Sequence, residues 1–333
     1  MPIKARLNWI DWMKVFGMYF IVLGHLFSVG MVYVYVFSVP LFFIISGYLT
    51  KRQDDNHVFW KKTWYNLVVP MLLISVICLV LDSVIALKIG KFDVDHIYKF
   101  PFELIFGFQN ATKNLWFVYT LVIIKIIYQY AHCSRRWLSC CIQWFLLLGL
   151  PLLGYLIRES SFQLGSHDLL HTSNSYINVC LAYPFFMLGT YMKKYREALN
   201  ARHRLIVELL LFTATLAGVI ACGRLNGIAM MYANSFGNNI FIFYMGGIFG
   251  TIMIYQICKW LDGVHLRCVT DISKGCILIL GFQWYLLDVV YKFRHGATLL
   301  DWGFSVLIVV AFVPFIRLVE KYCPLLMGKY RIE

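Results

Sequence analysis

The stretch VFGMYFIVLGHLFSVGMVYVYVFSVPLFFIISGYLT, residues 15–50, holds no Asp, Glu, Lys or Arg. A helix that crosses a bilayer needs about 20 apolar residues, so this stretch is too long for one span and about right for two. The turn between them is expected near Ser28, Gly30 and Tyr33. The sequence therefore predicts a pair of adjacent membrane helices near its amino-terminal end.

The same scarcity of charge extends along the whole chain. Hydrophobic residues make up 60% of the 333 residues and charged residues only 14%, whereas an ordinary globular protein is about a quarter charged. We therefore expect an all-α fold, a polytopic bundle of transmembrane helices that forms a single integral-membrane domain over residues 1–333. Besides the two spans in residues 15–50, further spans are expected at 64–87, 115–130, 137–157, 175–192, 205–222, 239–257, 275–290 and 299–316, which makes ten.

Lys and Arg residues fall unevenly on the two sides of this topology. With the amino terminus inside, the cytoplasmic segments hold 20 of them and the opposite side holds eight. Cytoplasmic loops carry the excess of Lys and Arg in membrane proteins, so both termini are expected in the cytoplasm. Topology thus explains the net charge of +13 without nucleic acid.

The ten cysteines show no CxxC and no metal-ligand spacing, so we expect buried thiols and no metal site.

Two ionisable side chains, Lys14 and His25, belong to the first expected span, and Lys125 lies in another. Lys14 and His25 are 11 residues apart, which is about 20° from whole turns of an α-helix, so both point to the same side. Their separation along the helix axis is about 16 Å. A cation at the inner mouth suits an anionic group from the cytoplasm, and an imidazole can take a proton from a hydroxyl near neutral pH.

A structural role for both side chains is also consistent with this pattern. Lys14 would then extend its ammonium group to the interface, and His25 would make a hydrogen bond between helices. Asp11 lies three residues before Lys14 on the same face, so these two side chains are placed to pair. Asp288, at about the depth of His25 in the ninth expected span, is a candidate either to orient the imidazole or to make an unrelated polar contact.

Two motifs lie in the two adjacent helices expected near the amino-terminal end. The first is IDWMK at residues 10–14 followed, after ten residues, by His25 in VLGH, and the second is VPLFFIISGY at residues 39–48. These motifs resemble those of the membrane-bound acyltransferase 3 family. Shorter matches cover nearly the whole chain: Pro70, LWF at 115–117, FFMLG at 185–189 and ISKG at 272–275. The first two motifs, in order and in adjacent helices, are the most specific.

This resemblance implies an O-acyltransferase that moves an acyl group, usually acetyl from acetyl-CoA, to a sugar hydroxyl of a surface polysaccharide or lipid-linked glycan. The family's basic residue and histidine correspond to Lys14 and His25. Lys14 would bind the CoA phosphates at the cytoplasmic mouth. His25 would be the catalytic residue, either as general base on the acceptor hydroxyl or as a nucleophile that carries the acyl group transiently.

The chain departs from the family pattern at several positions. Relatives often have two basic residues three apart where this chain has the adjacent Lys61 and Lys62, which are expected either to bind CoA phosphate or to form an ordinary positive flank. Asn114 and Gln283 stand where histidines are common. Asn114 and Trp116 are expected to contact the sugar by hydrogen bonding and stacking, although interface anchoring is the commoner role of such a tryptophan.

Other functional classes are consistent with the composition. A transporter of polysaccharide or a small solute is the main alternative, but paired halves with broken helices, which are typical of transporters, are not evident. A glycan polymerase or ligase would be expected to have a large basic outer loop, which residues 88–114 resemble only modestly.

For the acyltransferase, the expected location is a bacterial-type inner membrane, and the domain either acts alone or passes its acyl group to a separate extracytoplasmic partner. The sugar, its hydroxyl and the choice of acetyl or succinyl stay open.

Overall fold

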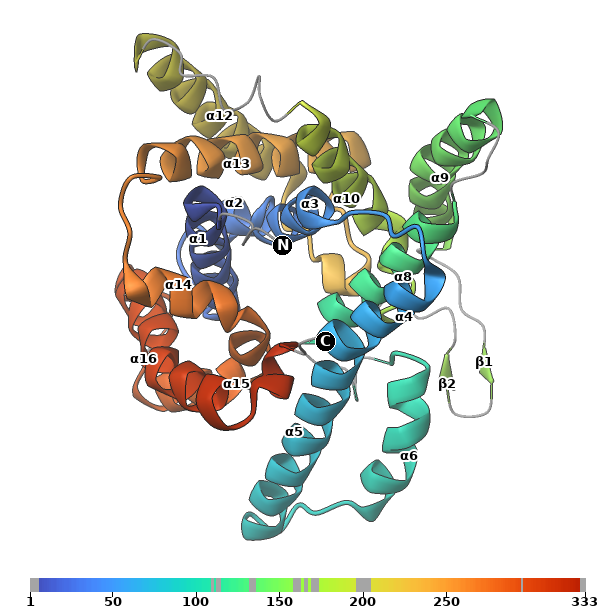
Figure 1. Cartoon of the computed structure of the whole chain (residues 1–333). Coiled ribbons are helices and arrows are strands. Elements are labelled where there is room, and N and C mark those ends of the chain that lie inside the picture. The colour runs from blue at the N-terminus through green and yellow to red at the C-terminus, as the bar shows by residue number, and fades with distance from the viewer. Residues whose placement is uncertain are drawn as a thin grey trace.

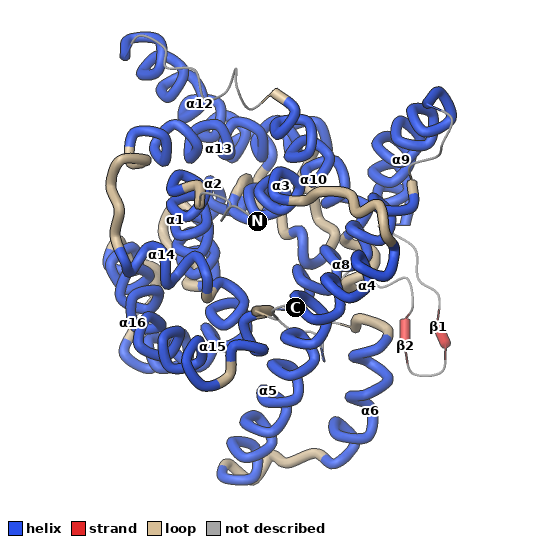
Figure 2. The backbone as a smooth tube through the Cα atoms, viewed as in Figure 1, coloured by secondary structure: helices blue, strands red, loops and turns tan. Residues whose placement is uncertain are grey.

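A computed structural model of the chain describes residues 6–108, 111, 115–131, 136–157, 163–164, 167–168, 174–195, 205–294 and 296–329. Nearly all the regular structure in this part of the chain is helical (Figures 1 and 2). The exception is a pair of two-residue antiparallel strands, β1 Gln163–Leu164 and β2 His167–Asp168.

The helices follow one another along the chain with short connections. They are α1 Asn8–His25, α2 Met31–Tyr35, α3 Ser38–Leu49, α4 Asn56–Thr63, a π-helical turn Trp64–Val68, α5 Val69–Lys88, α6 Val94–Ile105, α8 Trp116–Tyr130, α9 Arg136–Leu156, α10 Val179–Lys194, α12 Leu205–Asn226, a 3₁₀ turn Met231–Ala233, α13 Ile240–Trp260, α14 Arg267–Lys274, α15 Cys276–Phe293, α16 Leu300–Tyr322 and a 3₁₀ turn Pro324–Met327.

The expected all-α polytopic bundle is confirmed. Within the described residues, seven helical segments are long and apolar enough to cross a membrane: 31–49, 56–88, 137–156, 205–233, 240–260, 276–293 and 300–322. The other three expected spans coincide with α1, α8 and α10, of which α8 has 15 residues and α10 has 16. The count of ten spans, the single-domain boundaries and the cytoplasmic termini stay predictions.

Residues 15–50, the uncharged stretch, fold as two helical arms. The second arm is divided into two helices, α2 and α3. α1 ends at His25, and the backbone reverses through Phe27 and Gly30, which both adopt positive φ angles (47° and 87°). Glycine adopts this conformation at little cost because it has no Cβ. α2 and α3 then form the second arm, so the turn lies at the start of the region where the sequence predicts it.

α1 lies near the middle of the bundle, with α13 on one side and α14, α15 and α16 on the other (Figure 1). It contacts all four of these helices and also α2 and α3. Its buried side chains include Met13, Met18 and Val22, each at most 1% exposed. Because α1 carries both Lys14 and His25, these neighbours determine the surroundings of the two candidate site residues.

Candidate functional site

Neighbouring helices hold the carboxyl-terminal end of α1, where His25 lies. The hydroxyl of Tyr291 in α15 donates a hydrogen bond to the backbone carbonyl oxygen of His25. The hydroxyl of Tyr35 in α2 donates to the backbone carbonyl oxygen of Gly24 at 3.2 Å. The Trp284 ring lies beside the imidazole, with ring centroids 4.9 Å apart at an angle of 50°. These contacts fix the backbone and the ring plane of His25.

The imidazole nitrogens of His25 make no hydrogen bond to any side chain in the described part of the chain. Asp288, a candidate to orient the ring, is exposed on α15 and makes no hydrogen bond to it. His25 lines a cavity of about 50 Å³ instead. Its imidazole can therefore exchange a proton with a molecule in that cavity.

Segments distant in the sequence form the walls of this cavity, called here the His25 cavity. It is lined by Ile21, Gly24, His25, Tyr35, Ser38, Val39, Trp116, Phe117, Ala229, Met231, Tyr232, Leu280 and Gln283. The lining residues come from α1, α2, α3, α8, the connection between α12 and α13, and α15. Of the predicted substrate-binding residues, Trp116 lies here with His25, whereas Asn114 lies outside the described residues.

The connection between α12 and α13 folds against the bundle and contributes Tyr232 to the cavity. Buried asparagines hold it: the Asn226 side chain donates to the backbone oxygen of Phe236 at 2.6 Å, and Asn178, just before α10, donates to the backbone oxygen of Tyr232 at 3.2 Å. Buried backbone carbonyls need such partners, because water does not reach them. The segment therefore forms a fixed wall of the cavity.

Lys14 lies near the other end of α1 and lines a second cavity, of about 400 Å³. This Lys14 cavity is lined by Arg6, Leu7, Ile10, Asp11, Lys14, Tyr48, Leu49, Lys193, Ser273 and Lys274. Its walls thus carry four cationic side chains and one carboxylate. Such a surface attracts an anion of several charges.

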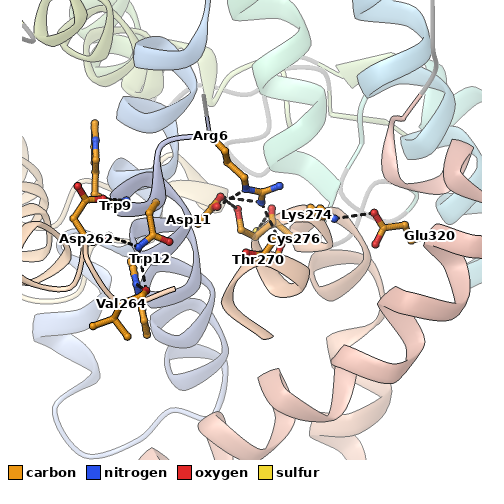
Figure 3. A network of polar contacts seen from close by, with 12 residues as sticks. Arg6, Trp9, Asp11, Trp12, Asp262, Val264, Thr270, Lys274, Cys276 and Glu320 are labelled. Carbon is orange, nitrogen blue, oxygen red and sulfur yellow. Dashed lines mark hydrogen bonds and ion pairs between the residues drawn. The ribbon is translucent and has the colours of Figure 1, made fainter. Parts of the chain in front are cut away.

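Asp11, the carboxylate of the Lys14 cavity, pairs with Arg6 and not with Lys14 as the helical spacing predicts (Figure 3). It also accepts a hydrogen bond of 2.6 Å from the hydroxyl of Ser273. Lys274 pairs with Glu320 at 2.9 Å. The i, i+3 expectation failed because Arg6, from the segment before α1, and α14 both reach Asp11. Lys14 has no ion-pair partner among the described residues.

Lys62 of α4 lines a third cavity, of about 240 Å³, together with Lys51, Gln53, Lys125 and residues of α3, α4, the π-helical turn and α8. The ammonium group of Lys62 donates to the side-chain oxygen of Gln53 at 2.8 Å. Lys61 lines neither this cavity nor the Lys14 cavity. Leu49 at the end of α3 lines both cavities, so they adjoin at that helix end.

A known protein family matches nearly the whole chain. A family model described as an acyltransferase domain matches residues 7–318, from just before α1 to near the end of α16. The chain belongs to the acyltransferase 3 family. No curated protein and no solved structure gives a significant match. The chain is therefore a membrane acyltransferase, whose donor and acceptor are taken up below.

Several residues of this acyltransferase that line the two cavities escape sequence reasoning. Tyr35, Tyr232 and Gln283 join His25, while Lys193 and Lys274 join Lys14. The two lysines carry a signal, because they stand among the cations that the sequence assigns to the predicted cytoplasmic side. At Gln283 the only signal is that a glutamine stands where relatives often have a histidine. No signal in the sequence marks Tyr35 or Tyr232 as site residues.

Proposed function

We propose that the chain transfers an acyl group, normally acetyl, from acyl-CoA to a sugar hydroxyl of a cell-surface polysaccharide or lipid-linked glycan. One observation carries this proposal. A single helix, α1, presents an imidazole to a small cavity at one end and an ammonium group to a cation-lined cavity at the other, and neither group has a side-chain partner among the residues that the structure describes. Two substrates that arrive from opposite sides of a membrane need such an arrangement.

His25 acts on the acceptor. Its imidazole removes the proton from the sugar hydroxyl while that oxygen forms a bond to the acyl carbonyl carbon. The carbon–sulfur bond then breaks, the sugar keeps the acyl group as an ester, and the sulfur takes the proton from the imidazolium to give free CoA. Trp116, on the wall of the same cavity, offers an apolar ring face for stacking of the sugar.

Lys14 acts on the donor. The phosphates of CoA carry several negative charges, which the cations of the Lys14 cavity can bind as point charges or by bidentate contact. The axial separation of about 16 Å between Lys14 and His25 is then spanned by the pantetheine arm. Lys62, in the third cavity that shares Leu49 with the Lys14 cavity, and its neighbour in the sequence Lys61 are proposed as outlying phosphate contacts.

The lining of the His25 cavity supports acetyl as the acyl group. The described residues that line it include no Lys or Arg, so a longer acyl chain that ends in a carboxylate would find no opposite charge there. We place the reaction in a bacterial-type inner membrane, with the glycan or a separate extracytoplasmic partner as acceptor.

The test compares the glycans of cells that express the chain with those of cells that lack it. Mass spectrometry should show a mass increase of one acetyl group per modified sugar only when the chain is present. Isotope-labelled acetyl-CoA supplied to membrane vesicles should transfer its label to the same glycan. A change in the amount or location of the glycan without added acyl groups would support a transporter instead.

Lys14→Met should weaken binding of acetyl-CoA and leave catalysis nearly unchanged. A hydrogen bond to a charged group contributes about 1.5–3 kcal/mol, so KM for acetyl-CoA should rise about 10- to 100-fold. Lys14→Arg should restore most of the affinity. The matched control is Lys99→Met on α6, which removes an equal charge at an exposed position. Unchanged KM in Lys14→Met would exclude Lys14 from donor binding.

A further inference from the structure

Gln283 has an environment that is hard to explain by structure alone. It lies in α15, is 0% exposed, and lines the His25 cavity. Neither the side-chain oxygen nor the side-chain nitrogen of its amide has a hydrogen-bond partner within the described part of the chain. Burial of an amide without hydrogen-bond partners destabilises the folded state. An apolar side chain of the same shape would avoid this cost.

Some other buried amides in the described part of the bundle have partners for one or both of their polar atoms. Asn226 uses both of its amide atoms, donating to Phe236 and accepting from the backbone N–H of Asn239 at 2.6 Å. The oxygen of Gln143 accepts from the Tyr183 hydroxyl at 3.0 Å. Gln283 is the only described residue for which two buried side-chain atoms lack a hydrogen-bond partner. Its two unused groups therefore coincide with the cavity that holds the candidate catalytic histidine.

We propose that Gln283 is a catalytic residue whose side-chain N–H binds the acyl carbonyl oxygen. This inference rests on the proposed function. When the sugar oxygen attacks the carbonyl carbon, the electron pair of the C=O bond moves to the oxygen, which becomes negative. The amide N–H stabilises that charge by a hydrogen bond, and when the C–S bond breaks the pair returns to re-form C=O. Gln283 itself gains and loses no proton.

The position of Gln283 suits this role for two reasons. First, His25 must lie against the acceptor hydroxyl, so the carbonyl oxygen needs a donor from another wall of the same cavity. Second, a donor shielded from water interacts more strongly with a developing charge than one in solvent. Tyr35, also in the cavity wall, already donates its hydroxyl proton to Gly24. The flexible side chain of Gln283 can turn its amide into the cavity when the acyl group enters.

Gln283→Met tests the proposal, because methionine has similar length and no N–H. With labelled acetyl-CoA and membrane vesicles that contain the glycan, kcat should fall about 10²- to 10³-fold, as when one oxyanion donor is lost. KM for acetyl-CoA should change less than threefold. The melting temperature in detergent should stay the same or rise, because the unpartnered amide is gone. Gln283→Glu, which replaces the N–H donor by an oxygen, should be as inactive as Gln283→Met.

Gln143→Met in α9 is the matched control. It removes a buried amide that does have a partner and lies away from the His25 cavity. It should lower the melting temperature and leave kcat unchanged. The proposal is overturned if Gln283→Met keeps the wild-type kcat, or if its activity loss matches a loss of folded protein. Wild-type vesicles that transfer no acetyl at all would instead refute the proposed function.

Discussion

Replacement of His25 by alanine should abolish acetyl transfer while the protein still inserts and folds. A positioned general base contributes about 10²- to 10⁴-fold to a rate, and a nucleophile would contribute at least as much. Alanine at position 25 leaves the backbone contact from Tyr291 in place, because the hydroxyl of Tyr291 bonds to the backbone oxygen and not to the ring. Stability should therefore change little. The measurement is label transfer from acetyl-CoA to glycan in membrane vesicles.

Two comparisons make the His25→Ala result specific. His265→Ala, which removes an exposed imidazole from the connection between α13 and α14, should retain wild-type activity. Equal amounts of both variants in the membrane fraction, with similar melting temperatures in detergent, would exclude a folding defect. Transfer by His25→Ala at more than a tenth of the wild-type rate would remove His25 from the mechanism.

The same preparation distinguishes the two roles of His25. Labelled acetyl-CoA is mixed with purified protein in the absence of glycan, and the peptide that contains His25 is analysed by mass spectrometry after rapid quenching. A mass increase of one acetyl group on the wild-type peptide indicates an acyl-imidazole intermediate. An unmodified peptide, together with transfer when glycan is added, indicates direct transfer with His25 as base.

The sequence predicts the helices of the bundle well because the signal is local. A run of 36 residues without charge, residues 15–50, is enough to predict two membrane helices and the region of the turn. The spacing of Lys14 and His25 likewise places both on one stripe of a helix, and each does line a cavity. Such predictions depend only on the period and rise of the α-helix.

The side chains that surround Lys14 and His25 are not predictable from the sequence, because they come from distant parts of the chain. Gln283 reaches His25 from α15, and Tyr232 reaches it from the connection after α12. A single sequence gives the length and apolar face of each helix, but not which helices become neighbours. For the same reason the expected pairing of Asp11 with Lys14 was wrong, since Arg6 and Ser273 take the carboxylate.

Replacement of Gly47 in α3 by leucine should prevent stable assembly of the bundle. A Cβ atom at position 47 would overlap the backbone carbonyl oxygen of Phe186 in α10, and one at Gly189 would overlap that of Ile44 in α3. The two glycines thus let the helix backbones touch at their crossing, as small residues do in membrane bundles. Both obstructing atoms belong to backbone, so no side-chain rotation can relieve the overlap.

Separation of α3 from α10 would affect both candidate cavities. Ser38 and Val39 of α3 line the His25 cavity, and Tyr48 and Leu49 line the Lys14 cavity. Overpacking within a core usually costs about 1–3 kcal/mol, and a backbone-to-backbone overlap should cost more than this range. We therefore expect Gly47→Leu to aggregate on extraction into detergent and to lack acetyl transfer in membranes.

Gly303 in α16 provides the matched control for this crossing. It also lies within a span, but a Cβ atom there would meet no other atom within 4 Å. Gly303→Leu should elute from size-exclusion chromatography as the wild type does and should melt at the same or a higher temperature, because leucine favours helix over glycine by about 1 kcal/mol. If Gly47→Leu elutes and melts like Gly303→Leu, the α3–α10 contact is not the close backbone crossing described above.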